Sequence, residues 1–147
     1  MTEDERRAWA YLSRVAEAPN PRIAVLVKTM GVLEAAERVR RRDLPDAKLL
    51  SATEARHGID CAREDLEVLD RLGGRLLTPG DEEWPATAFG SFDGVDKAKR
   101  PQGYAPLALW VVGPSSLVEV AARAAALVGT RAASDYGEFA AADLAAG

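Results

Sequence analysis

The sequence has 147 residues, of which 48% are hydrophobic and 29% charged, a composition typical of a globular protein and unlike that of disordered or fibrous chains. No apolar run approaches the roughly 20 residues that a membrane helix needs, and the acidic N-terminus lacks the basic start of a secretory signal. The net charge of −4 excludes a protein that is basic overall, so contacts with phosphates must come from individually placed residues. We therefore expect a cytoplasmic protein that makes no contact with membranes.

The single cysteine and the single histidine are not arranged as a metal or redox site. Cys61 has no second thiol for a disulfide or for a shared set of metal ligands. His57 has no Cys, His or carboxylate at the spacing of a zinc site. We therefore predict no metal and no cofactor, with Cys61 on a helix and His57 in a loop or at a helix end.

Helical signals fill the N-terminal half of the chain. Thr2-Glu-Asp-Glu5 has the pattern of a capping box and predicts a helix that ends before Pro19-Asn-Pro21. Apolar residues at helical spacing predict a second helix over residues 21–30, and another apolar stripe predicts a third helix after Gly31.

Two further signals complete the predicted bundle. Ser51-Ala-Thr-Glu54 matches a second capping box and predicts a helix start. Apolar residues from Ile59 to Leu72 mark a longer helix, which Gly73-Gly74 closes with a left-handed cap. Residues 1–74 are therefore predicted to form a compact bundle of four or five helices.

Four arginines crowd the last turn of the third predicted helix: Arg38, Arg40, Arg41 and Arg42. Cations at a helix C-terminus offset the exposed backbone carbonyls, and we favour this structural interpretation. A contact with nucleic acid is the alternative.

The character of the sequence changes after residue 74. Residues 75–78 are short and extended, Pro79-Gly80 forms a turn, and Pro85 disfavours helix at Trp84. Residues 86–105 show neither helical nor strand periodicity in their apolar residues. We interpret residues 75–106 as a linker.

Order returns in two continuous apolar runs, at residues 107–112 and 124–128, which have the pattern of strands covered on both faces. The second run leads into Gly129, and a helix is expected from Ser134 or Asp135, since both are good N-cap residues. Glycine lets the backbone approach a ligand closely, and the first N–H groups of a helix point at an anion. Arg131 can add a paired contact to a phosphate, so the pattern favours a phosphate-binding turn.

This pattern lacks the three glycines of a dinucleotide fingerprint and the lysine of a P-loop. An ordinary turn between strand and helix, with Arg131 in solvent, is therefore the alternative on spacing alone.

Three segments together carry a more specific resemblance. Leu-Val-Gly-Thr-Arg-Ala-Ala-Ser-Asp-Tyr-Gly, residues 127–137, resembles the signature that opens the Rossmann-like domain of the DprA/Smf family of DNA-processing proteins. Residues 107–113 resemble the strand that precedes this signature in the family. Residues 74–85 resemble the family's link between its helical domain and its Rossmann-like core. The resemblance runs from about residue 5 to the end and is strongest over 124–137.

The resemblance implies an α/β protein in three segments. Residues 1–74 would be an all-α bundle of the sterile-alpha-motif or helix-hairpin-helix kind, and residues 75–106 a linker. Residues 107–147 would be the opening βα unit of a Rossmann-like parallel sheet, which is incomplete in this chain. We therefore expect a fragment or a truncated reading frame, and the alternative is a short protein that uses the same opening segment differently.

The family resemblance also implies a function. It implies a protein that binds single-stranded DNA, loads the recombinase RecA, protects incoming DNA during natural transformation in competent cells, and acts as a homodimer. It implies binding and no catalysis, so no catalytic residue is assigned. The phosphate contacts carry over to Gly129, Thr130, Arg131 and Ser134. The hairpin at residues 28–32 has one glycine where a DNA-gripping hairpin has two, so we do not expect the helical domain to contact DNA.

Two other classes of function stay open from the residues. A Rossmann-like enzyme that holds a nucleotide phosphate would need a carboxylate near the turn, and Glu119 and Glu138 are the acids closest in sequence. A helical interaction domain that carries an unfolded tail is the third interpretation.

Overall fold

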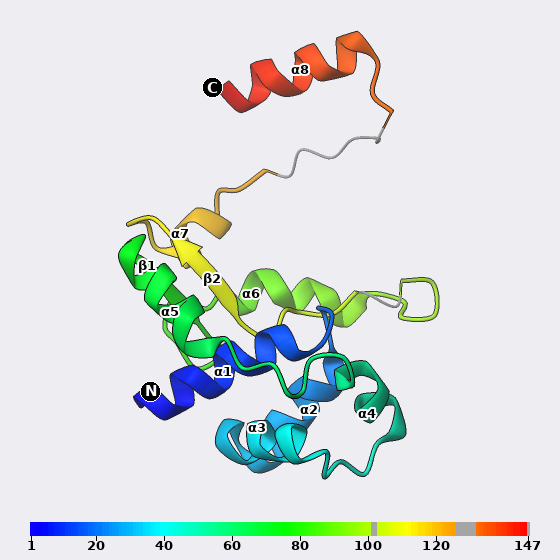
Figure 1. Ribbon diagram of the computed structural model, residues 1–147. Coiled ribbons are helices and arrows are strands. Elements are labelled where there is room, and N and C mark those ends of the chain that lie inside the picture. The colour runs from blue at the N-terminus through cyan, green and yellow to red at the C-terminus, as the bar shows by residue number, and fades with distance from the viewer. Residues whose placement is uncertain (101–102, 126–131, 147) are drawn as a thin grey trace.

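The computed structural model describes residues 1–100, 103–125 and 132–146. Five helices occupy the first 74 residues, which confirms the predicted bundle of four or five helices (Figure 1). They are α1 (Glu3–Val15), α2 (Pro21–Met30), α3 (Val32–Arg41), α4 (Ala47–Thr53) and α5 (Ala62–Arg71).

The first two helices begin where the sequence predicts. At the start of α1, the Glu5 backbone N–H donates to the Thr2 hydroxyl at 3.2 Å, and the Thr2 N–H donates to the Glu5 carboxylate at 2.7 Å. This is the predicted capping box. Asn20 caps α2, and Gly31 separates α2 from α3 with a φ of 84°, a conformation that favours glycine. The predicted bounds of α2 are confirmed.

The predicted helix start at Ser51 is wrong. Asp46 is the N-cap of α4, and its carboxylate accepts from the backbone N–H groups of Lys48 and Leu49. Residues 51–53 form the last turn of that helix, where the buried Thr53 hydroxyl donates to the Leu49 carbonyl at 2.9 Å. A strong cap directly after a proline therefore starts the helix five residues before the weaker capping-box match.

The start of α5 also differs from the expectation, whereas its end agrees with it. Ile59 lies before α5 with 59% of its surface exposed, and Cys61 is the N-cap residue rather than a helical one. Gly73 follows α5 with a φ of 64°, which confirms the predicted left-handed cap there. Gly74 instead begins a strand.

The core of the bundle lies between α1, α3 and α5. Ala35 and Ala36 on α3 and Ala10 on α1 have no exposed surface. Small side chains allow helix axes to approach closely, and the larger Tyr11 and Leu12 fill the space beside them. α1 contacts both α3 and α5, so it is the central helix of the bundle.

A small sheet lies against the bundle (Figure 1). β1 (Gly74–Leu77) and β2 (Leu109–Val112) pair antiparallel, with Gly74 opposite Val112 and Leu77 opposite Leu109. β1 packs on α5, and Leu76 belongs to the same hydrophobic core as the helices. The Trp110 indole N–H donates to the Ser13 hydroxyl at 3.2 Å and joins β2 to α1.

The fold is therefore mixed α/β, but the two described strands are antiparallel and the predicted parallel Rossmann-like sheet is not confirmed. The expectation that the first apolar run is covered on both faces is wrong. Leu109 and Val111 are half-buried, whereas Trp110 is 36% exposed and Val112 59% exposed. Most of the second run, at 124–128, lies outside the described residues.

The segments around the sheet contain short helices. The region expected to be aperiodic holds α6 (Ala86–Phe89) and a 3-10 helix η1 (Gly90–Gly94), and Trp84 packs edge-on against Phe89. α7 (Leu117–Ala121) follows β2, and α8 (Asp135–Ala146) is the helix predicted to start near Ser134. The division into segments 1–74, 75–106 and 107–147 stays a prediction.

Candidate nucleic-acid interface

Of the four predicted phosphate-contacting residues, Gly129, Thr130 and Arg131 lie outside the described residues. Ser134 is described, and it caps α8. Its hydroxyl accepts from the Gly137 backbone N–H at 3.3 Å, and its carbonyl accepts from the Glu138 N–H at 3.0 Å. The cap confirms the predicted helix start, while the DNA contact of Ser134 stays a prediction.

The first turn of α8 carries Asp135 and Glu138 and no basic residue. Acidic side chains stabilise the positive end of a helix, and they also oppose a bound phosphate there. A phosphate next to Ser134 therefore needs a cation from outside α8. Arg131 is the nearest basic residue in the sequence.

The arginine cluster at the end of α3 is held by partners within the protein. Arg38 pairs with Glu34 at 2.7 Å, and Arg41 pairs with Glu37 at 2.6 Å. Arg42 donates to the Leu50 carbonyl at 2.8 Å. These three arginines thus have partners within the protein, but none of the partners is a carbonyl at the end of α3, so both interpretations of the cluster stay predictions.

Arg40 belongs to a partly exposed polar group next to Tyr11. It pairs with Asp60 at 2.7 Å, and its guanidinium lies 4.2 Å from the centre of the Tyr11 ring. Tyr11 donates to the His57 carbonyl at 2.7 Å, and burial raises the pKa of Tyr11 to about 12. His57 lies in the turn after α4, as predicted. The described residues contain no cluster of three His, Cys, Asp or Glu side chains suited to a metal.

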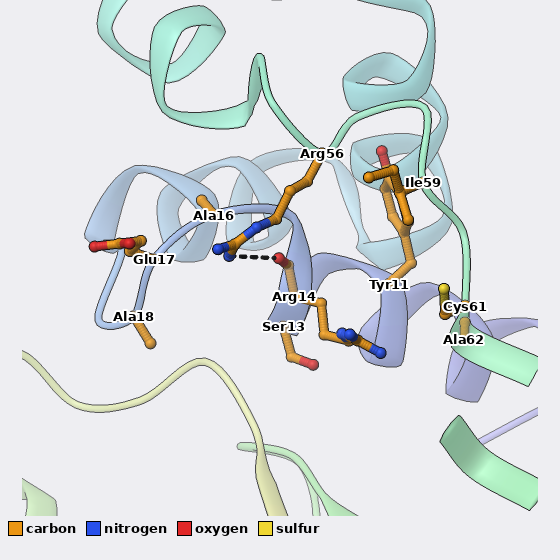
Figure 2. Close-up of a pocket in the computed structure, with 10 residues that line it drawn as sticks. All are labelled: Tyr11, Ser13, Arg14, Ala16, Glu17, Ala18, Arg56, Ile59, Cys61 and Ala62. Atoms are coloured by element: carbon orange, nitrogen blue, oxygen red, sulfur yellow. Dashed lines mark hydrogen bonds between the residues drawn. The ribbon is translucent and has the colours of Figure 1, made fainter. Parts of the chain in front are cut away.

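A cavity of about 620 Å³ opens where α1 ends, beside the loop that leads to α5 (Figure 2). Figure 2 shows Arg56 reaching across it to donate to the Arg14 backbone carbonyl, at 3.3 Å. Arg14 itself pairs with Asp65 on α5, and that hydrogen bond raises the pKa of Arg14. Arg56 thus satisfies a carbonyl at the helix end.

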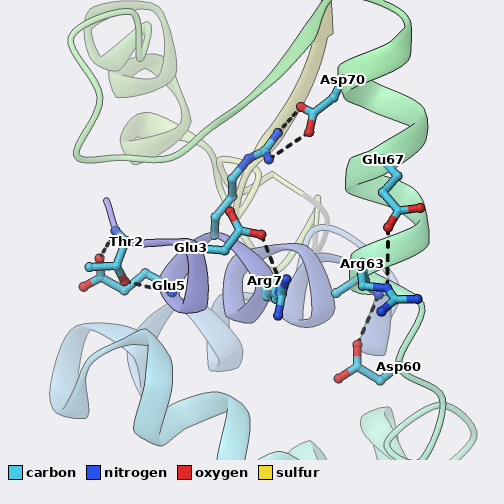
Figure 3. A network of polar contacts seen from close by, with 10 residues as sticks. Thr2, Glu3, Glu5, Arg7, Asp60, Arg63, Glu67 and Asp70 are labelled. Carbon is cyan, nitrogen blue, oxygen red and sulfur yellow. Dashed lines mark hydrogen bonds and ion pairs between the residues drawn. The ribbon is translucent and has the colours of Figure 1, made fainter.

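Ion pairs also neutralise the face shared by α1 and α5 (Figure 3). Arg6 grips both carboxylate oxygens of Asp70, at 3.2 and 2.5 Å, and this contact lowers the pKa of Asp70. Arg7 pairs with Glu3, and Arg63 lies 3.5 Å from Glu67. On this face, Arg6, Arg7 and Arg63 are thus paired with carboxylates and do not form a run of free cations such as a typical nucleic-acid binder presents.

A second polar cluster surrounds Arg75, and sequence reasoning missed its role. Arg75 donates to Glu83 through Nε at 2.9 Å and Nη2 at 2.5 Å. The same guanidinium donates to the carbonyls of Gly113 at 2.6 Å and Ser115 at 2.7 Å. Arg75 therefore joins β1 to the turn that follows β2. The only sequence signal was the family resemblance of residues 74–85, which carries no information about these partners.

The turn before Glu83 is fixed by Asp81. Its carboxylate accepts from the Thr78 backbone N–H and from the Thr78 hydroxyl, both at 2.7 Å. The hydrogen bond from Arg75 is the main cause that lowers the pKa of Glu83. This carboxylate is therefore charged at neutral pH.

The carboxylates that an enzyme would need are not gathered in a described cleft. Glu119 on α7 and Glu138 on α8 are both exposed, and neither lines one of the described cavities. Among the described residues, no helix is both long and apolar enough to cross a membrane.

Two curated proteins are similar to the chain along its whole length. The chain is 56% identical over all of its 147 residues to the DNA processing protein DprA of Mycobacterium tuberculosis, in both strain CDC 1551 / Oshkosh and strain ATCC 25618 / H37Rv. It spans 38% of the length of these relatives. No family model matches the chain, and no solved structure matches it. The whole-length match confirms the resemblance to the DprA/Smf family that the sequence motifs predicted.

Proposed function

We propose that this chain, a relative of the DprA/Smf DNA-processing proteins, takes part in binding single-stranded DNA as a recombination mediator. The observation that carries the proposal is the 56% identity to DprA along the whole chain. The match covers the whole chain, so it includes both the helical bundle and residues 127–137. In this proposal the turn holds the DNA and the bundle has a structural role.

The proposed phosphate contacts are Gly129, Thr130, Arg131 and Ser134. Two features of the described residues support them. Most arginines of the bundle have partners within the protein, and at Arg6, Arg38 and Arg40 an added phosphate would have to compete with a carboxylate. The helix α8 begins directly after Ser134, so its N-cap residue follows Arg131 by three positions in the sequence, and Arg131 is the cation that would offset the acidic first turn.

The wider biological role that we propose is taken from the resemblance to the DprA/Smf family. We propose that the protein of which these residues form a part loads RecA onto single-stranded DNA and protects incoming DNA during natural transformation. We also propose that it acts as a homodimer in the cytoplasm. The proposed role is binding without catalysis, and the exposed positions of Glu119 and Glu138 support it, because a general acid or base works inside a cleft.

The test is a titration of the 147-residue chain with a labelled single-stranded oligonucleotide at low and at physiological salt. Binding should be measurable at low salt and weak at physiological salt, with a Kd above roughly 10 μM, because few phosphates are contacted and the net charge is negative.

Arg131→Ala should weaken binding by about 1–3 kcal/mol and lower the salt slope by roughly 0.7, the value for one phosphate contact on a single strand. Arg131→Lys should recover only part of the loss, because lysine cannot make the paired contact. Arg123→Ala is the matched control, since Arg123 precedes the apolar run. Equal binding by Arg131→Ala and Arg123→Ala would show that the site is wrongly assigned.

A further inference from the structure

Arg56 lines a cavity and has no carboxylate partner. Within the described residues, the bundle arginines without an ion pair are Arg42, Arg56 and Arg71. Of these, only Arg56 lines one of the described cavities, the one of about 620 Å³ at the end of α1. Its one described hydrogen bond, to the Arg14 carbonyl, is long at 3.3 Å. Because a guanidinium has five N–H donors, most of them stay available to a ligand.

The same cavity contains an acidic side chain without a described partner. Glu17 lines it, is exposed, and makes no side-chain hydrogen bond or ion pair with the residues that the structure describes. Figure 2 shows the Glu17 carboxylate directed away from the Arg56 guanidinium, so the two groups do not neutralise each other directly. A molecule in this cavity would therefore meet a cation at one place and an anion at another.

The helix ends around the cavity add little net charge. The cavity lies between the C-terminus of α1 and the N-terminus of α5. These two ends carry partial charges of opposite sign, so they offset each other. Arg14 also lines the cavity, but its charge is paired with that of Asp65. The side chains of Arg56 and Glu17 therefore decide which charged groups can bind.

The rest of the cavity wall is largely apolar and includes Ala16, Ala18, Ile59 and Ala62. Ile59 has 59% of its surface exposed, so a ligand that covers it removes apolar surface from water. The volume of about 620 Å³ lies within the range of roughly 300–1,000 Å³ that is typical of small-molecule sites. The cavity thus suits a molecule whose apolar body joins an anionic group to a group that donates hydrogen bonds.

We propose that this cavity binds a nucleotide. Arg56 holds the phosphate, because the guanidinium fork matches the spacing of phosphate oxygens. Glu17 accepts from an amino group of the base, as carboxylates do from cytosine in DNA, and the apolar wall covers the base and the sugar. An amino acid carries its two charges on neighbouring groups, which does not suit side chains that point apart. The nucleotide is either free or part of single-stranded DNA, and the inference does not rest on the proposed function.

Cys61 reports directly on occupancy, because it lines the cavity, is partly exposed and is the single cysteine of the chain. The experiment measures how fast iodoacetamide, a neutral reagent, alkylates Cys61 in the 147-residue chain. Deoxyadenosine monophosphate should slow the alkylation to saturation, with a Kd of roughly 1 mM or below. Deoxyadenosine lacks the phosphate, and deoxythymidine monophosphate lacks an amino group on its base, so both should protect Cys61 more weakly.

Variants assign the two ends of the ligand. Arg56→Ala should raise the Kd of deoxyadenosine monophosphate about tenfold or more, the effect of losing a hydrogen bond to a charged group. Arg56→Lys should recover part of this loss. Glu17→Gln should raise the Kd about threefold and bring it closer to that of deoxythymidine monophosphate.

Arg71→Ala is the matched control for Arg56→Ala. It also removes an exposed arginine without a described carboxylate partner, but Arg71 lines none of the described cavities. It should bind like the unaltered chain. Each variant is alkylated with and without nucleotide, so that a change in the reactivity of Cys61 itself cancels.

A deoxyadenosine oligonucleotide without terminal phosphates separates the two sources of nucleotide. Stronger protection of Cys61 by the oligonucleotide than by the monophosphate, lost in Arg56→Ala, would support the site and assign it to single-stranded DNA. Stronger protection by the monophosphate, also lost in Arg56→Ala, would support the site and assign it to a free nucleotide.

Three results would overturn the proposal. The first is the absence of protection by either probe at roughly 10 mM nucleotide. The second is equal protection by deoxyadenosine and its monophosphate, which decides the matter in the unaltered chain even where a variant does not fold. The third is an equal Kd for Arg56→Ala and Arg71→Ala. None of these results involves Arg131, so the failure of this site and the failure of the proposed function are distinguishable.

Discussion

The bundle and the segment from β2 onward use their apolar residues in opposite ways. In the bundle, the apolar faces of α1, α3 and α5 are buried against one another. From β2 onward, large apolar side chains remain exposed in the described residues. They are Trp110, Val112, Val118, Val120, Tyr136, Phe139 and Leu144. The bundle also exposes large apolar side chains such as Val25 and Leu33, but it buries a core, whereas the described residues from β2 onward contain no buried apolar side chain.

Charged residues show the same contrast. Most arginines of the bundle pair with carboxylates, either on another helix, as Arg6 does with Asp70, or on the same helix, as Arg38 does with Glu34. On α8, three acidic side chains occur without a basic one. Each surface ion pair contributes little to the free energy of unfolding. The pairs nevertheless show which helix faces have charges that are matched by opposite charges within the protein. The comparison therefore predicts that changes in the bundle affect folding and that changes after β2 affect it little.

The largest change that tests this contrast is to remove everything after residue 74. The isolated segment 1–74 should keep a helical circular dichroism spectrum and a cooperative melt, because its helix caps and most of its core are internal. It should be less stable than the whole chain, since Leu76 also belongs to the core. A spectrum of a disordered chain at neutral pH would contradict the division at this residue.

A matched pair of leucines sharpens the contrast at single residues. Leu12 is 1% exposed and Leu144 is 67% exposed. Leu12→Ala should lower the free energy of unfolding by about 2–5 kcal/mol, because it leaves a cavity in the core. Leu144→Ala should change it by less than about 0.5 kcal/mol. Urea unfolding of the two variants measures both effects, and equal losses would mean that α8 is buried in solution.

The features that the sequence predicted correctly are those set by residues close together in the chain. The capping box at Thr2 and the cap at Gly73 are local and were predicted correctly. Ser51-Ala-Thr-Glu54 failed because Asp46 offers a competing cap that the motif does not take into account. The pairing of β1 with β2 joins Gly74 to Val112, and no local pattern specifies a partner so distant in the chain.

The candidate site also contains one feature that local sequence predicted and others that it could not predict. The start of α8 at Ser134 follows from one good N-cap residue, and it is confirmed. Arg75 could not be found from the sequence, because two of its acceptors are backbone carbonyls at Gly113 and Ser115. Any residue type provides such a carbonyl, so the sequence gives no sign of it. The roles of Gly129, Thr130 and Arg131 stay predictions.

A smaller effect tests which signal starts α4. Asp46→Ala should lower the free energy of unfolding by about 1 kcal/mol, because it leaves the N–H groups of Lys48 and Leu49 without their acceptor. Ser51→Ala is the control and should be nearly neutral, since Ser51 lies inside the helix and is exposed. A larger loss of stability for Ser51→Ala than for Asp46→Ala would support the capping box predicted at Ser51.

The smallest expected effect is the dependence of the bundle on acid through Asp70. Arg6 lowers the pKa of Asp70 in the folded protein, so the charged form is favoured by folding. The stability from this pair is present above the unfolded pKa of about 3.9 and is lost as the pH falls through the lower folded value. Asp70→Asn should therefore be less stable than the unaltered chain at pH 7, and the difference should shrink below about pH 4.

Other carboxylates titrate in the same pH range, so the comparison is repeated in an Arg6→Ala background. There Asp70→Asn should cause no loss of stability that depends on pH, because the partner that lowers the pKa is absent. A pH-dependent loss that persists without Arg6 would show that another group holds Asp70, and that the α1–α5 face is not neutralised by the pair seen in the structure.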